Sequence, residues 1–147
     1  MRKTIRAVLV QIQQDIVTNL NSYIQASQLE GEDWFKPLSF HDDSPKYDTD
    51  TFFMGIYLAS PEGSVFEGNS SNGKVTVALD CVLNKTREDS NLPQLYLSAV
   101  IDYLTRRSYG VSSAPTYAEV MRVDNGYPRN SFSVAIEATV YNMDYDI

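Results

Sequence analysis

The chain has a single cysteine, Cys81, so it cannot form an internal disulfide or a site with several thiolate ligands. Its one histidine, His41, leaves little choice of partner for catalysis by general acid and base. No apolar run approaches the ~18 residues of a membrane-spanning helix, and polar residues from Gln11 to Asp15 interrupt the run that would complete a signal peptide. We therefore expect no membrane contact and no export signal, and the scarcity of cysteine is typical of a reducing compartment.

Basic residues are also fewer than acidic ones. The chain has twelve lysines and arginines and nineteen aspartates and glutamates, which gives a net charge of -7. Proteins that bind nucleic acid neutralise phosphates with lysine and arginine, so this balance argues against such a partner. The 147 residues are 43% hydrophobic, which suffices for a compact domain with its own core. We expect a single domain over residues 1–147.

Hydrophobic periodicity predicts two helices and four strands. Apolar residues at spacings of three and four predict helices over roughly residues 3–28 and 92–107, the second opened by Asn91 and Pro93. Alternating or aromatic-rich runs predict four strands, at residues 52–58, 74–83, 116–124 and 131–142. The order α-β-β-α-β-β predicts an α+β fold, a mostly antiparallel sheet with two helices packed on one face.

Two segments lack this periodicity. Residues 30–51 are rich in aspartate and contain a few aromatic side chains, which predicts a long acidic connection pinned by those aromatics. Residues 60–74 are rich in glycine, serine and asparagine and offer only Val65 and Phe66 to a core. They predict a protruding hairpin arm, which costs the fold little and is available for contact with a partner.

Candidate catalytic and metal-binding groups are few. His41 stands beside aspartates of the type that ligates divalent ions, but the same run fits a solvated acidic loop, and residues 48–50 lack the glycine and glutamate of a calcium loop. Cys81 falls on the inward side of a predicted strand, where a thiol is buried and inert. The glycine-rich residues 68–73 lack the lysine of a phosphate-binding loop. We predict no enzyme, no metal site and no cofactor.

Ten tyrosines are the most informative feature of the composition. A tyrosine combines a broad apolar ring with a polar tip, which is why this residue is enriched at protein interfaces. The same property suits half-buried positions in a core. Both interpretations of the tyrosines stay open from the sequence.

Four segments carry the order of elements over nearly the whole chain, namely residues 4–28, 74–83, 92–107 and 131–140. In order and length they resemble the tail-terminator and tail-completion proteins of long-tailed bacteriophages, although no signature motif is involved. The resemblance implies a structural virion protein without an active site, assembled in the host cytoplasm and located in the tail or neck. Such a protein forms a ring, commonly of six subunits, that caps the tail tube and joins it to the head connector.

The resemblance also implies partners: copies of the chain itself, a tail tube protein and a head-completion protein, with DNA passing through without specific binding. A ring needs two different complementary patches on each subunit, and opposite charges are available for them. An acidic inner wall would repel the passing DNA. The candidate interface residues are Arg2, Lys3, Arg6, Asp42, Asp43, Asp48, Asp50, Phe66, Arg106, Arg107 and Tyr127.

Two other classes of protein stay open. A non-viral adaptor domain with the same layout would bind a protein or glycan through exposed tyrosines and the arm at 60–74. An enzyme or a metal-dependent protein would be centred on His41.

Overall fold

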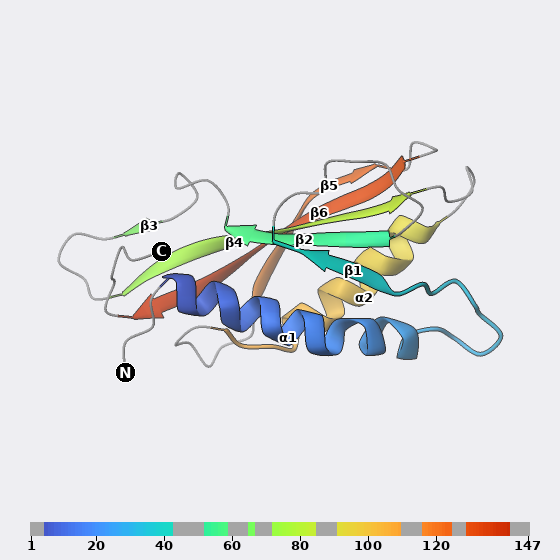
Figure 1. Cartoon of the computed structure of the whole chain (residues 1–147), viewed down its shortest axis with the longest axis horizontal. Helices are drawn as coiled ribbons and strands as arrows, with labels where there is room; N and C mark the ends of the chain where they lie inside the picture. Colours follow the sequence, from blue (N-terminus) through green and yellow to red (C-terminus); the bar gives the residue numbers. More distant parts are fainter. Residues whose placement is uncertain are drawn as a thin grey trace.

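The computed structural model describes residues 5–42, 52–58, 65–66, 72–84, 91–109, 116–124 and 129–141 (Figure 1). Within them the chain forms two helices, α1 (Ile5–Ala26) and α2 (Leu92–Thr105). It also forms six strands: β1 (Leu38–His41), β2 (Phe52–Leu58), β3 (Val65–Phe66), β4 (Asn72–Asn84), β5 (Tyr117–Asp124) and β6 (Arg129–Tyr141).

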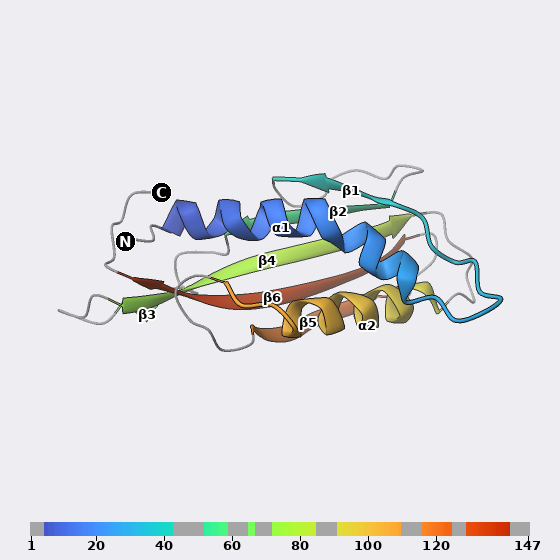
Figure 2. The same ribbon diagram turned by 90° about the horizontal axis from the view of Figure 1, so that it is seen from below.

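The strands form one mixed sheet in the order β1-β2-β4-β6-β5, with β3 paired to β4. Only β1 and β2 run parallel, and the other pairs are antiparallel. Both helices lie on the same face of this sheet, where α1 packs against β2 and β6, and α2 against β5 and β6 (Figure 2). The predicted α+β fold with a mostly antiparallel sheet is confirmed.

The core lies between the helices and the sheet. Across the three central strands, Met54 aligns with Cys81 and Cys81 with Phe132, and all three side chains are buried on the helix face. The predicted stripe of α1 is buried along its length, at Val8, Ile12, Ile16, Leu20 and Ile24. From α2 the buried residues are Pro93, Tyr96, Ala99, Val100, Tyr103 and Leu104.

Both helices end two residues earlier than the sequence predicts. At α1 the amide of Ser27 donates to the carbonyl oxygens of Tyr23 and Ile24, and the Ser27 hydroxyl also donates to Ile24. These bonds satisfy the last carbonyls of the helix and close it at Ala26. Arg106 caps the end of α2, and Asn91 begins that helix without the side-chain cap that the sequence suggests.

The acidic connection at 30–51 is more ordered than predicted, because it contains β1. The Asn21 side chain donates to the Leu38 carbonyl at 3.1 Å and accepts from the Leu38 amide at 2.8 Å. Gln28 accepts from the amides of Trp34 and Phe35 at 2.8 and 2.9 Å. These amide side chains of α1 hold the returning chain in place, so that β1 can pair with β2.

The described residues of the predicted arm at 60–74 pair as a hairpin does, and the rest of the arm stays a prediction. Val65 and Phe66 pair with Lys74 and Gly73, and β4 begins at Asn72 rather than at Lys74. From there β4 pairs with β6 over thirteen residues, from Asn72 opposite Tyr141 to Asn84 opposite Arg129. Residues 60–64 and 67–71 lie outside the described part of the chain.

Candidate interaction surface

The outer strand β5 carries the largest group of exposed apolar side chains. Seven large hydrophobic residues are exposed in the described part of the chain, and four of them lie on this strand. They are Tyr117 and Met121, each 60% exposed, Val120, 45% exposed, and Val123, 39% exposed. β5 is the last strand in the sheet, so one of its edges is paired with β6 and the other has no partner strand among the described elements. Such a patch on an unpaired edge is typical of a contact surface.

A β-bulge shapes this strand. Val120 pairs with Val134 and Arg122 with Ser133, so Met121 is an extra residue on the bulged strand. Ser133 and Ala135 point to the same face of β6, and their partners Arg122 and Glu119 therefore share the sheet face opposite the helices. Without the bulge, these two residues, three apart, would point to opposite faces.

A second, smaller apolar group lies on the outside of α1. Val10 and Val17 are exposed and seven residues apart, which places them on one stripe of the helix. The packing of α1 against β2 places this stripe beside the half of the sheet far from β5. The described surface therefore has two separate apolar groups.

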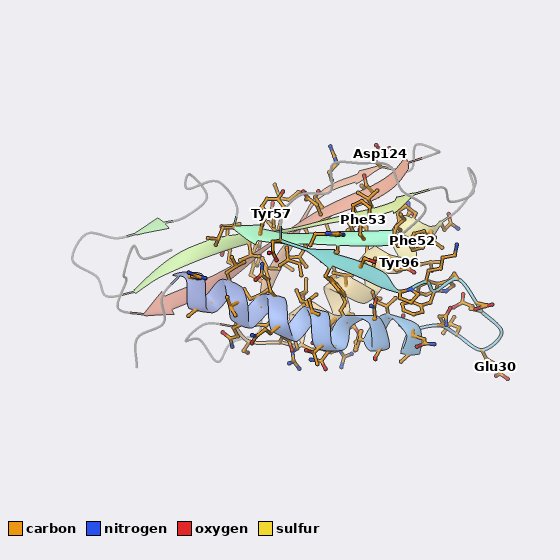
Figure 3. All side chains as sticks on the ribbon, in the orientation of Figure 1. Glu30, Phe52, Phe53, Tyr57, Tyr96 and Asp124 are labelled. Atoms are coloured by element: carbon orange, nitrogen blue, oxygen red, sulfur yellow. The ribbon has the colours of Figure 1, made fainter. Side chains whose placement is uncertain are left out.

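The sheet face opposite the helices carries a polar network. Asp80 of β4 accepts a hydrogen bond from the Tyr57 hydroxyl at 2.6 Å and another from the Ser133 hydroxyl at 2.7 Å (Figure 3). The ring of His41 contacts the ring of Phe53 edge to face on this same face. Each oxygen of the Asp80 carboxylate accepts from one hydroxyl, so this side chain joins β2, β4 and β6. Its role is therefore structural.

Asp15 organises the most heavily bonded side-chain cluster among the described residues. Its carboxylate accepts from the hydroxyls of Tyr103 and Tyr109 at 2.9 and 2.6 Å and from the Arg107 guanidinium at 2.5 and 3.2 Å. Burial alone raises the pKa of the Asp15 carboxyl, but the hydrogen bonds from Tyr109, Tyr103 and Arg107 outweigh it and leave this pKa below the usual value. These four residues, called the Asp15 cluster below, join α1 to the end of α2.

The structure places the predicted interface residues in different environments. Arg6 on α1 and Asp42 after β1 are exposed, as an interface requires. Arg106 is in an ion pair with Asp102 at 3.2 Å, and Arg107 belongs to the Asp15 cluster, so neither is a free cation. The prediction that these two arginines complement an acidic patch on a neighbour is therefore weakened. The other candidates lie outside the described part of the chain or have no described side chain: Arg2, Lys3, Asp43, Asp48, Asp50, Phe66 and Tyr127.

Most of the described tyrosines serve the core. Tyr96 is fully buried, and its hydroxyl donates to the Lys36 carbonyl at 2.7 Å and accepts from the Lys36 amide at 2.6 Å. Burial and the bond to Asp15 raise the pKa of Tyr103 to about 12. Only Tyr117 is a largely exposed tyrosine among the described residues. The sequence did not single out Val120, Met121 and Val123, although two adjacent apolar residues that break the alternation of a strand are a signal of a bulge.

The cysteine prediction is confirmed. Cys81 is fully buried, and burial raises the pKa of its thiol. Among the described residues no three histidine, cysteine or acidic side chains gather as a metal site would require. Neither described helix combines the length and the apolar character needed to cross a bilayer.

Comparisons with protein-family models, with curated proteins and with solved structures found no match to this chain. The exposed surface of β5 and α1 is therefore the feature from which we infer a function.

Proposed function

We propose that this chain is a structural subunit of a phage or prophage virion, of the tail-terminator kind. Copies of it assemble into a ring of six that caps the tail tube and joins it to the head connector. The observation that carries the proposal is the exposed apolar side chains of β5, on a strand edge that pairs with no other described strand. Exposed apolar side chains are a cost to a protein that works alone, and their burial becomes stabilising when another protein covers them.

A closed ring requires contacts between unlike surfaces, since each subunit meets its neighbour head to tail. The outer stripe of α1 supplies one of these surfaces, and it is separate from the exposed side chains of β5, which stay free for a contact outside the ring. Arg6 extends the stripe of Val10 and Val17 toward the beginning of α1 and supplies a positive charge there. We assign the contact between neighbours in the ring to the stripe of α1.

The net charge of -7 fits a subunit that lets DNA pass without binding it. Exposed acidic residues such as Glu30, Asp33 and Asp42 cluster in the connection between α1 and β2. If this connection lines the channel, phosphates are repelled from the wall. Such a protein occurs in the host cytoplasm during assembly and afterwards in the tail or neck of the virion.

The mass in solution tests this proposal. Light scattering across a concentration series, with and without magnesium, should reveal a species of six subunits, or of twelve where two rings associate. Electron microscopy should show it as a ring with a central hole. A monomer at every concentration, in both conditions, would contradict the ring and favour the alternative, an adaptor domain that uses its exposed aromatic residues on another protein.

A matched pair of variants then locates the contact between neighbours. Val17→Glu places a charge on the exposed stripe of α1 and should abolish the ring while the melting temperature stays the same. Thr18→Glu adds the same charge at an exposed position one residue further along α1 and should leave the ring intact. Equal effects of the two substitutions would argue against a specific contact on this stripe.

A further inference from the structure

The free edge of β5 is long enough to form a sheet with another strand. The strand has eight residues, which extend over about 27 Å, and its outer edge has no partner strand among the described elements. Backbone amide and carbonyl groups on such an edge pair readily with a strand of another chain. The side chains on β5 determine which strand fits.

Charge complementarity points to a second copy of the same strand. Glu119 and Arg122 share one face because of the bulge at Met121, and neither has a hydrogen-bond or ion-pair partner within the described part of the chain. In an antiparallel pair with its two-fold axis between Val120 and Met121, Glu119 of each copy stands opposite Arg122 of the other. Opposite charges that directly face each other across two strands stabilise the pair.

We propose that two copies of this chain pair through β5 in this register and extend the sheet across a two-fold axis. The same register sets Ala118 opposite Val123 and Val120 opposite Met121, so that apolar residues meet apolar residues. Registers centred on Glu119 or on Arg122 set two like charges opposite each other and are disfavoured. Charged residues on an edge also discourage unrelated strands, so the arrangement is selective for a copy of itself.

This contact goes beyond the proposed ring and does not depend on it. A two-fold contact closes with two copies and cannot build a ring of six. A subunit that makes both contacts forms two rings face to face, with twelve copies, and the β5 edges then lie on one flat face of each ring. The mass of the assembly in solution therefore distinguishes three cases. The β5 contact alone gives two copies, the ring alone gives six, and the two contacts together give twelve.

Exchange of the two charges tests the register. Glu119→Arg and Arg122→Glu, made separately, each set like charges opposite each other, and each protein alone should have half the mass of the wild type. An equal mixture of the two proteins should regain the wild-type mass, because every facing pair is then opposite in charge. The double variant E119R/R122E should regain it alone. Glu30→Arg, an exposed charge reversal in the connection after α1, is the matched control and should not change the mass.

Sedimentation velocity at low ionic strength provides the masses, and circular dichroism verifies that every variant is folded. If either single variant keeps the wild-type mass, or if the mixture and the double variant both remain at half mass, the β5 pairing is wrong. A wild-type mass of one or six copies would also overturn it. Six copies would leave the proposed ring standing, whereas two copies would support the β5 contact and contradict the ring.

Discussion

The carboxylate of Asp15 and the guanidinium of Arg107 form a two-point ion pair across 92 residues of sequence. Oδ1 accepts from Nη2 at 2.5 Å and Oδ2 accepts from Nε at 3.2 Å, while the carbonyl oxygen of Arg107 accepts both from the amide and from the hydroxyl of Thr116 at 2.8 Å. Thr116 is the residue before β5. The pair therefore joins the middle of α1 to the beginning of the strand that carries the exposed apolar patch.

The first prediction concerns the stability of this cluster. Asp15→Ala removes the acceptor of four side chains, those of Asn19, Tyr103, Arg107 and Tyr109. It leaves the largely buried hydroxyls of Tyr103 and Tyr109 without their partner, so it should cost about 2–3 kcal/mol of unfolding free energy. Chemical denaturation measures this loss. Asp102→Ala removes the partner of two exposed groups, the Arg106 guanidinium and the Tyr23 hydroxyl, and should cost distinctly less. Equal losses for the two variants would contradict the importance of the Asp15 cluster.

The second prediction concerns pH. The pKa of Asp15 is lower in the folded chain than in the unfolded one, so the folded state is stabilised above the unfolded value, near 3.8. That contribution should disappear as the pH falls below about 4, through the folded pKa. Denaturation at a series of pH values should show a difference between the wild type and Asp15→Asn that is constant near neutrality and shrinks in acid. A difference that stays constant down to pH 2 would be inconsistent with the lowered pKa.

The third prediction concerns the connection after α1. Tyr96→Phe keeps the ring that packs against Trp34, Phe35 and Phe52 but removes the hydroxyl that bonds both backbone groups of Lys36. We expect a loss of about 1–3 kcal/mol, because two partly buried backbone groups lose their partner. Hydrogen exchange should become faster at the Lys36 amide while the amides in the middle of β4 keep their protection. Unchanged exchange at Lys36 would show that the hydroxyl does not hold this segment.

The fourth prediction compares two methionines. Met54 is fully buried in the core and Met121 is mostly exposed on β5. Met54→Ala should lower the unfolding free energy by about 2–5 kcal/mol because it leaves a cavity. Met121→Ala should change it by no more than about 0.5 kcal/mol, measured below the concentration at which the chain associates. A large loss from Met121→Ala would mean that β5 is covered within a single chain.

The fifth prediction concerns Cys81. Its buried thiol and raised pKa should make it inert to a maleimide in the native state, with labelling only as fast as the protein opens. Mass spectrometry during labelling measures the rate, which should rise in parallel with unfolding as denaturant is added. Rapid labelling of the folded chain would indicate that the core between β4 and the helices opens locally.

The candidate surface was less predictable than the fold. Arg106 and Arg107 appear in the sequence as a basic pair at a helix end, but their partners Asp102 and Asp15 become visible only when α1 and α2 pack together. Val120 and Val123 are three residues apart, which breaks the alternation of a regular strand, and only the bulge at Met121 lets both pair with buried residues of β6. They are nevertheless exposed, because β5 lies at the edge of the sheet and α2 covers that edge only in part.

The helices and the inward faces of the central strands are predictable from the amino-acid order alone, because hydrophobic period is a local property. The buried stripe of α1 and the alternation of Val77, Leu79, Cys81 and Leu83 follow directly from it. That residues 38–41 form a strand emerges only when the chain is folded, since β1 depends on the side chain of Asn21 and on pairing with β2. Folding also determines which strand is outermost, and so where apolar side chains stay exposed, because strand order depends on contacts between residues far apart in the chain.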